Sequence, residues 1–250
     1  MSTAAGPGGP AASPAPGAAW VLLPVAWCAW LLAWLVPSFL VVPHLAVERV
    51  WLVREAAPQA ILAAAAFFLV AVWPFWLALA RREAPRAAVS AKWLALSVLE
   101  LVMLVALAAP FVLVAWSVGG KAILAGPLAA TVGAWAVFGL GLRVAAQAGQ
   151  GAARWLMLAA VLVSVGPLIL GYAAGETLGV GFPRLVEASP IVSGIGLALG
   201  GWPEGAWPWI AAVALWPAVG MVLGLVGWWR TCREQHAPSP PRRVFDTLGG

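Results

Sequence analysis

The chain has 250 residues, of which 63% are hydrophobic and only 9% are charged, and its formal net charge is +5. Soluble domains carry about 25% charged residues. The few charged side chains of this chain could not cover the surface of a soluble protein of this length. The positive charge lies at the boundaries of apolar segments rather than in one patch, so we expect no nucleic-acid partner. The composition therefore predicts an integral membrane protein in contact with lipid.

The first 17 residues are Met, Ser, Thr, Ala, Gly and Pro without any charge. Such a low-complexity segment cannot bury enough apolar surface to fold, so residues 1–17 are predicted to be a disordered tail. A cleavable signal peptide would need a basic segment and a shorter apolar stretch. We therefore interpret the apolar segment that follows as a retained signal anchor.

Six apolar segments follow one another along residues 18–230, and each has about the 17–25 residues that a helix needs to cross a bilayer. A membrane β-barrel would need strict alternation of apolar and polar residues, which is missing, so helices are predicted. The sequence indicates an all-α membrane protein with a six-helix transmembrane domain and a tail at residues 231–250. The six predicted spans are residues 18–42, 60–80, 93–116, 123–142, 155–172 and 209–229.

Ten of the fourteen Lys and Arg residues gather in three stretches that separate or end pairs of spans. Basic residues stay on the cytoplasmic side of a bilayer, so both termini are predicted to be cytoplasmic. The predicted location is the bacterial cytoplasmic (inner) membrane. The clustered basic residues are Arg81, Arg82, Arg86, Lys92, Arg143, Arg154, Arg230, Arg233, Arg242 and Arg243.

The connection between the fifth and sixth spans, residues 173–208, is predicted to lie outside and is itself apolar. Ser189 and Pro190 resemble an N-cap and the first residue of a helix, which would run for about ten residues to Gly200. A second short helix could open at Phe182 and Pro183. Because neither is long enough to cross, re-entrant or interfacial helices are predicted.

Two patterns within the spans indicate helix packing. Trp27, Trp30 and Trp34 form a stripe at helical spacing in the first span, which is more typical of packing or lipid contact than of a cofactor site. Gly220 and Gly224 form a GxxxG pattern in the last span, and small residues at this spacing let two helices approach closely. Whether that contact is within the chain or between two copies stays open.

Glu100 is the single acidic residue well inside a predicted span, roughly 10 Å from the cytoplasmic end at 1.5 Å per residue. A carboxylate at such depth costs about 2.5–3.5 kcal/mol unless it is paired, hydrated or protonated. Glu100 is therefore the candidate functional residue, as a proton carrier or a polar anchor. The alternative is a carboxyl group that only fixes helix packing, and the sequence shows no intramembrane partner for it.

Signatures of enzymes and cofactor sites are missing. His44 and His236 fall on opposite predicted sides of the membrane, and Cys28 and Cys232 are too far apart in sequence for a CxxC site. There is no HExxH, GxSxG or P-loop pattern. We expect no catalytic residues, no metal and no cofactor.

Several short patterns from about residue 60 to residue 230 resemble ABC-2 type transporter permeases. They lie before the third span, at its end, around the fourth span and in the segment before the last span. They are Pro85-Arg86, Ala91-Lys92-Trp93-Leu94-Ala95, Ala109-Pro110-Phe111, Gly119-Gly120, Gly139-Leu140-Gly141 and Ala188-Ser189-Pro190.

The resemblance implies an export permease that is opened and closed by a separate cytosolic ATPase, with a second permease copy or partner enclosing the path. Arg81, Arg82, Arg86 and Lys92 would then form the segment that receives the motion of the ATPase, and residues 143–154 a second contact. Both segments can also be read as determinants of topology alone. Residues 1–17 lack the charged interface helix with which such permeases typically begin, so the resemblance is to a divergent member.

Two alternatives stay open at this point. A non-transporting structural or assembly subunit of a membrane complex would also lack the interface helix, and Trp-rich surfaces would suit its contacts with protein and lipid. An intramembrane enzyme that uses Glu100 is the other.

Overall fold

The computed structural model describes residues 16–45, 50–80, 90–119, 125–147, 150–178, 189–192, 195–196 and 207–235. Within these ranges nearly every residue is helical and no strand occurs. Most of the predicted tails, most of the connection at 173–208 and the second predicted short helix at Phe182 lie outside the described residues.

Four of the long helices extend beyond their predicted spans at both ends. The helix predicted at 60–80 begins ten residues earlier and ends where predicted, and the one predicted at 123–142 begins at Ala125 and ends at Ala146. The elements are α1 (Pro16–Leu45), α2 (Val50–Phe67), η1 (Phe68–Val72), α3 (Trp73–Ala80), α4 (Ala91–Gly119), α5 (Ala125–Ala146), α6 (Gln150–Leu178) and α9 (Trp207–Gln235).

Five helical stretches in the described part of the chain are long and apolar enough to cross a membrane, and they fit an integral membrane protein. In α1 the stretch Val21–Pro37 is apolar but shorter. The first predicted span therefore stays a prediction. The five long stretches are Ala57–Leu77, Ala91–Ser117, Ala125–Ala146, Gly151–Gly175 and Val213–Arg233.

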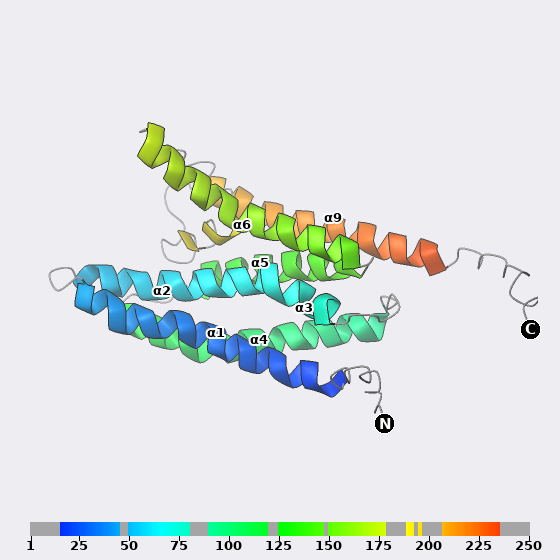
Figure 1. Cartoon of the computed structure of the whole chain (residues 1–250), viewed down its shortest axis with the longest axis horizontal. Helices are drawn as coiled ribbons and strands as arrows, with labels where there is room; N and C mark the ends of the chain where they lie inside the picture. Colours follow the sequence, from blue (N-terminus) through cyan, green and yellow to red (C-terminus); the bar gives the residue numbers. More distant parts are fainter. Residues whose placement is uncertain are drawn as a thin grey trace, which may run out of the picture.

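The helices run roughly alongside one another in a bundle, with α5 at its centre (Figure 1). On one side of α5 lie α1, α2 and α4, and on the other lie α6 and α9 (Figure 1). The first turn of α1 and the last turn of α9 lie at the same end of the bundle. The helices from α1 to α6 alternate in direction in Figure 1, as expected when short connections join neighbouring helices.

A single π-helical segment joins α2 to α3 into one continuous helix. The Trp73 N–H donates to the Phe68 carbonyl, five residues back, instead of to the carbonyl four residues back. Pro74 follows directly and has no N–H, so the wider turn accommodates the residue that a regular α-helix would not. Phe68, Leu69, Val70 and Ala71 are buried, so the irregular backbone lies within protein and not against lipid.

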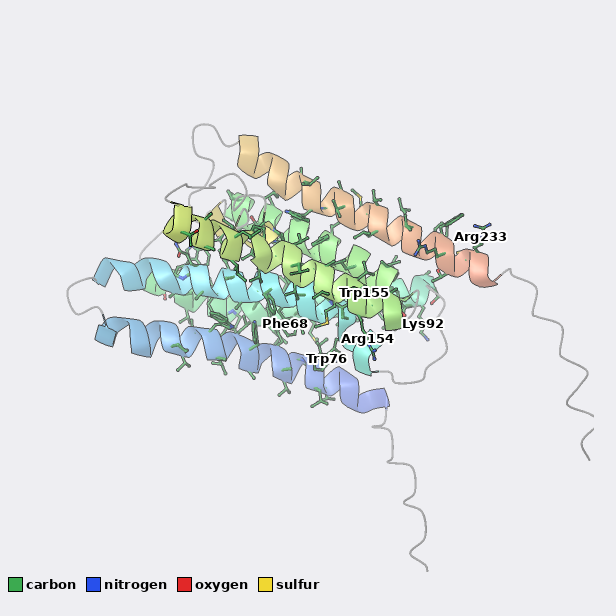
Figure 2. The ribbon with its side chains drawn as sticks, turned by 45° about the horizontal axis from the view of Figure 1, so that its top comes forward. Phe68, Trp76, Lys92, Arg154, Trp155 and Arg233 are labelled. Carbon is green, nitrogen blue, oxygen red and sulfur yellow. The ribbon has the colours of Figure 1, made fainter. Side chains whose placement is uncertain are left out.

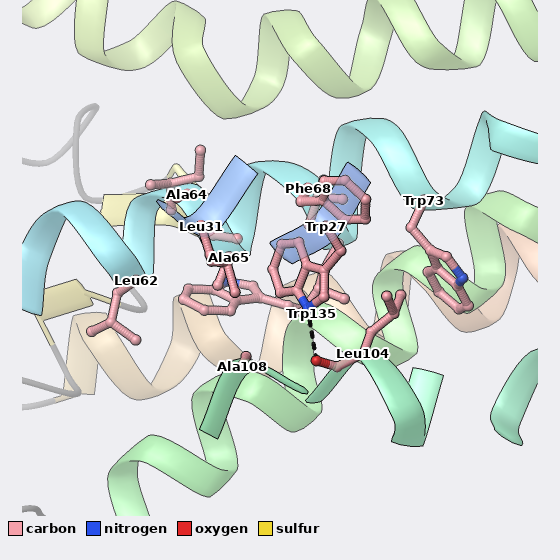
Figure 3. Packing of buried hydrophobic residues seen from close by; sticks show 14 of the residues in the cluster. Trp27, Leu31, Leu62, Ala64, Ala65, Phe68, Trp73, Leu104, Ala108 and Trp135 are labelled. Atoms are coloured by element: carbon pink, nitrogen blue, oxygen red, sulfur yellow. Dashed lines mark hydrogen bonds between the residues drawn. The ribbon is translucent and has the colours of Figure 1, made fainter. Parts of the chain in front are cut away.

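The tryptophan stripe fastens α1 to its neighbours, as the packing interpretation predicts. The indole N–H of Trp27 donates to the Leu104 carbonyl of α4 at 2.8 Å, drawn as a dashed line in Figure 3. The Trp30 indole donates to the Ala64 carbonyl of α2 at 3.0 Å. Trp27 also lies against Phe68, with ring centroids 4.4 Å apart, whereas Trp34 is partly exposed. Two of the three indoles thus tie α1 to α4 and α2.

The GxxxG pattern in α9 is used for contact within the chain. A Cβ atom placed on Gly220 would lie 2.6 Å from the Phe138 Cα of α5, and one on Gly227 would lie 2.6 Å from the Ala145 Cα. Gly224 lies against Gly141, where an added Cβ would be 3.4 Å from the Gly141 Cα. Because these glycines have no side chains, the backbones of α5 and α9 come into direct contact along this crossing.

Candidate functional site

Glu100 lies on the inner face of α4, where its side chain is 1% exposed. It lies nine residues after the start of α4, which corresponds to about 14 Å along the helix axis. A buried carboxylate without a partner would cost several kcal/mol, so its surroundings decide whether this position is tolerable.

Arg143 of α5 is the partner of Glu100. The Arg143 Nη2 donates to the Glu100 Oε2 at 2.5 Å, and the Arg143 side chain is also 1% exposed. The Arg143 Nη1 donates to the Trp73 carbonyl of α3 at 3.3 Å. One guanidinium therefore joins three helices, α3, α4 and α5, in the interior of the bundle.

Two tryptophan rings complete the surroundings of the guanidinium. The Arg143 Cζ lies 4.9 Å from the ring centroid of Trp73 and 5.7 Å from that of Trp93. Aromatic faces attract a cation most strongly where water is excluded, so both rings offset part of the cost of burying Arg143. Trp93 belongs to the first turn of α4, so the cluster of Glu100, Arg143, Trp73 and Trp93 also includes the beginning of this helix.

The pairing corrects the sequence analysis at two points. Glu100 does have a partner inside the bundle, and Arg143 is not a residue of a connecting loop, because α5 continues to Ala146 and buries it. The apolar run before Arg143 ends at Leu142, so hydropathy alone ended the span four residues before α5 ends at Ala146. The missed signal was a lone acidic residue in one predicted span and a lone basic residue directly after the next.

Three basic residues of the described ranges, whose side chains are exposed, lie at one end of the bundle. Lys92 at the start of α4, Arg154 near the start of α6 and Arg233 near the end of α9 lie at the same end in Figure 2. The buried pair lies toward this end, since Arg143 is three residues from the end of α5. Arg81, Arg82 and Arg86, the other candidate coupling residues, lie outside the described residues.

At Ser189–Ile191 the chain is packed between α5 and α6. The Ser189 Oγ accepts from the Ile191 N–H at 3.3 Å, and helical structure begins at Pro190, so the predicted N-cap is confirmed. The Ser189 Oγ also donates to the Ser164 carbonyl of α6 at 2.7 Å, and the Trp135 indole of α5 donates to the Pro190 carbonyl at 2.8 Å. This start of a helix is buried in the bundle.

Replacing Ser189 with alanine is expected to destabilise the protein by about 1–2 kcal/mol, because a buried cap and a buried contact to α6 are both lost. For a chain of this size such a loss lowers the thermal midpoint by about 2–8 °C. The measurement is thermal unfolding of the purified protein in detergent. Ser117→Ala is the matched control, since the Ser117 hydroxyl donates to the Val114 carbonyl on an exposed face of α4. Equal midpoints for the two variants would contradict a stabilising role of the Ser189 hydroxyl.

The cluster around Glu100 provides a polar connection between helices. Among the described residues, no group of three or more His, Cys, Asp and Glu side chains lies together as a metal site would require. The chemistry that the geometry offers is the making and breaking of an ion pair between α4 and α5. Such a pair fixes the relative position of two helices as long as it is closed.

Comparisons of the chain with known protein families, with curated proteins and with solved structures found no match.

Proposed function

We propose that this protein is a six-span permease subunit of an ABC-2-like export system, driven by a separate cytosolic ATPase. Both termini face the cytoplasm in this proposal, the membrane is the bacterial inner membrane, and a second permease copy or partner encloses the path. The resemblance described above is the origin of the proposal. The start of a helix at Ser189–Ile191 supports it, since the resemblance includes a segment with short helices before the last span.

The observation that carries the proposal is the buried pair of Glu100 and Arg143. A permease must pass a movement at its cytoplasmic face into its membrane helices. Residues 81–90 lead into α4 and residues 147–149 lead out of α5, and these connections correspond to the two predicted ATPase contacts. Arg143 ties α4 and α5 together close to both connections, so a force on either one would move both helices as a unit.

The test is affinity purification of the tagged full chain from mild detergent, with identification of the co-purifying proteins. We expect a P-loop ATPase in near-stoichiometric amount. Changing Arg81, Arg82, Arg86 and Lys92 together to glutamine should remove the ATPase while the chain still inserts into the membrane. Arg230→Gln with Arg233→Gln is the control, because this pair is also exposed and basic but lies at the end of α9. ATPase retention in the fourfold variant would contradict the coupling role.

A structural or assembly subunit is the second candidate, and the apolar outer surface of α6 and α9 favours it. Trp155, Trp228 and Trp229 are each at least half exposed, and large exposed apolar patches mark contacts with lipid or protein. This candidate predicts that other membrane subunits co-purify and that no ATPase does. The same purification therefore separates the two functions.

A further inference from the structure

A cavity of about 530 Å³ lies between α5 and the group formed by α1, α2 and α4. Its buried floor includes Trp27, Leu62 and Ala65, which are labelled in Figure 3. Its rim includes residues of α4 and α5 that are exposed. The volume falls in the range of about 300–1,000 Å³ that is typical of ligand pockets in proteins.

The walls of the cavity offer almost nothing to a polar ligand. The described residues that line it are Ala, Val and Leu, with Trp27 as the single exception. The indole N–H of Trp27 is already committed to the Leu104 carbonyl at 2.8 Å. Apolar cavities of this kind do not hold water, because a water molecule needs two to four polar partners.

The mouth of the cavity continues into the apolar outer surface of α4. Val105 and Leu113 belong to the rim and are 37% and 58% exposed. Leu99 and Val102 continue the same exposed apolar surface toward the start of the helix. A surface of this composition on a membrane-length helix lies against hydrocarbon, so the cavity is a lateral opening to the bilayer interior.

We propose that this cavity binds one hydrocarbon chain of a bilayer lipid. An unfilled space would deprive its walls of dispersion contacts, and an alkyl chain restores them without leaving a polar group unsatisfied. The rim of α4 from Val105 to Leu113 spans about 12 Å at 1.5 Å per residue, which suits a segment of a chain lying along the helices. The proposal depends on membrane residence and not on export.

The cavity also has a defined depth. It lies beside the second half of α4 and the first half of α5, away from the end where Lys92, Arg154 and Arg233 gather. The bound chain therefore belongs to a lipid of the leaflet opposite the basic end. If both termini are cytoplasmic, that leaflet is the outer one.

The test is photolabelling of the full chain in vesicles of phosphatidylethanolamine and phosphatidylglycerol. The probe is a phosphatidylglycerol with a diazirine in the middle of one acyl chain, and adducts are located by peptide mass spectrometry. We expect adducts on the cavity-lining residues of α4 and α5 in excess of those on the outer surface at Leu99 and Val102. These cavity adducts should be lost in Ala129→Phe and in Ala109→Phe, which place a ring inside the opening.

Matched controls lie one and three residues away on the same helices. Ala130 and Ala106 are exposed but do not line the cavity, so Ala130→Phe and Ala106→Phe should keep the cavity adducts. Size-exclusion chromatography checks that each variant is folded, and two independent filling variants guard against failure of one. Equal labelling in all four variants would overturn the proposal, as would adducts at Leu99 and Val102 that are as frequent as those in the cavity.

Discussion

Replacing Gly141 with alanine is expected to destabilise the bundle near the upper end of the about 1–3 kcal/mol that overpacking costs. A Cβ atom on Gly141 would lie 1.9 Å from the Gly220 carbonyl oxygen and 2.7 Å from the Gly220 Cα of α9. Both are backbone atoms, so no rotamer change can make room. The two helices would have to separate along the whole crossing, which Gly220, Gly224 and Gly227 also form.

The measurement is the thermal midpoint of purified Gly141→Ala in detergent, compared with that of Gly133→Ala. Gly133 lies on the same helix two turns earlier, and an added Cβ there would meet nothing within 4 Å. Alanine at Gly133 should be neutral or slightly stabilising, because alanine favours the helix by up to about 1 kcal/mol over glycine. A midpoint for Gly141→Ala as high as that for Gly133→Ala would show that the crossing tolerates separation.

The same pair of variants bears on the use of the GxxxG pattern. Since Gly220 and Gly224 face α5, substitutions there act on the fold of a single chain. The sequence predicts close approach of the last span to some helix, but a small-residue pattern carries no information about its partner. Gly141 could be assigned to the crossing only once the directions and positions of α5 and α9 were known.

Features that depend on local chemistry could be read from the sequence. The helical character and the approximate positions of the long helices follow from the length of the apolar runs. The cap at Ser189 follows from a hydroxyl residue directly before a proline, and it is confirmed. The stripe of Trp27 and Trp30 follows from spacing alone, and both indoles indeed pack against neighbouring helices.

Features that depend on contacts between distant residues could not be read in this way. The close approach of α5 to the π-helical segment before Pro74 is one such feature. Gly139 of α5 illustrates this, because an added Cβ there would lie 2.4 Å from the Leu69 carbonyl oxygen. Glu100 and Arg143 are likewise 43 residues apart, and only the packing of α4 against α5 brings them together.

Removing Arg143 is expected to have the largest effect of any single charge change in the described bundle. Arg143→Ala leaves Glu100 buried without its partner, and breaking a buried pair on one side costs about 3–5 kcal/mol. We expect little folded protein in detergent, measured as the monodisperse fraction in size-exclusion chromatography. Arg154→Ala is the control, because Arg154 is exposed at the same end of the bundle and its removal should cost little.

Removing both charges together tests what the pair is for. A buried ion pair can often be replaced by apolar side chains of similar volume at little cost, so Glu100→Leu combined with Arg143→Met should recover the folded fraction. If the pair only fixes packing, this double variant still binds the ATPase, and ATP hydrolysis stays coupled to the permease. If the pair transmits movement between the two cytoplasmic connections, the double variant folds and binds the ATPase but uncouples its hydrolysis from the permease.

A double variant that does not fold would give a third answer. The packing of Trp73 and Trp93 would then depend on the Arg143 guanidinium, because only a planar cation can lie over both rings and still donate to the Trp73 carbonyl.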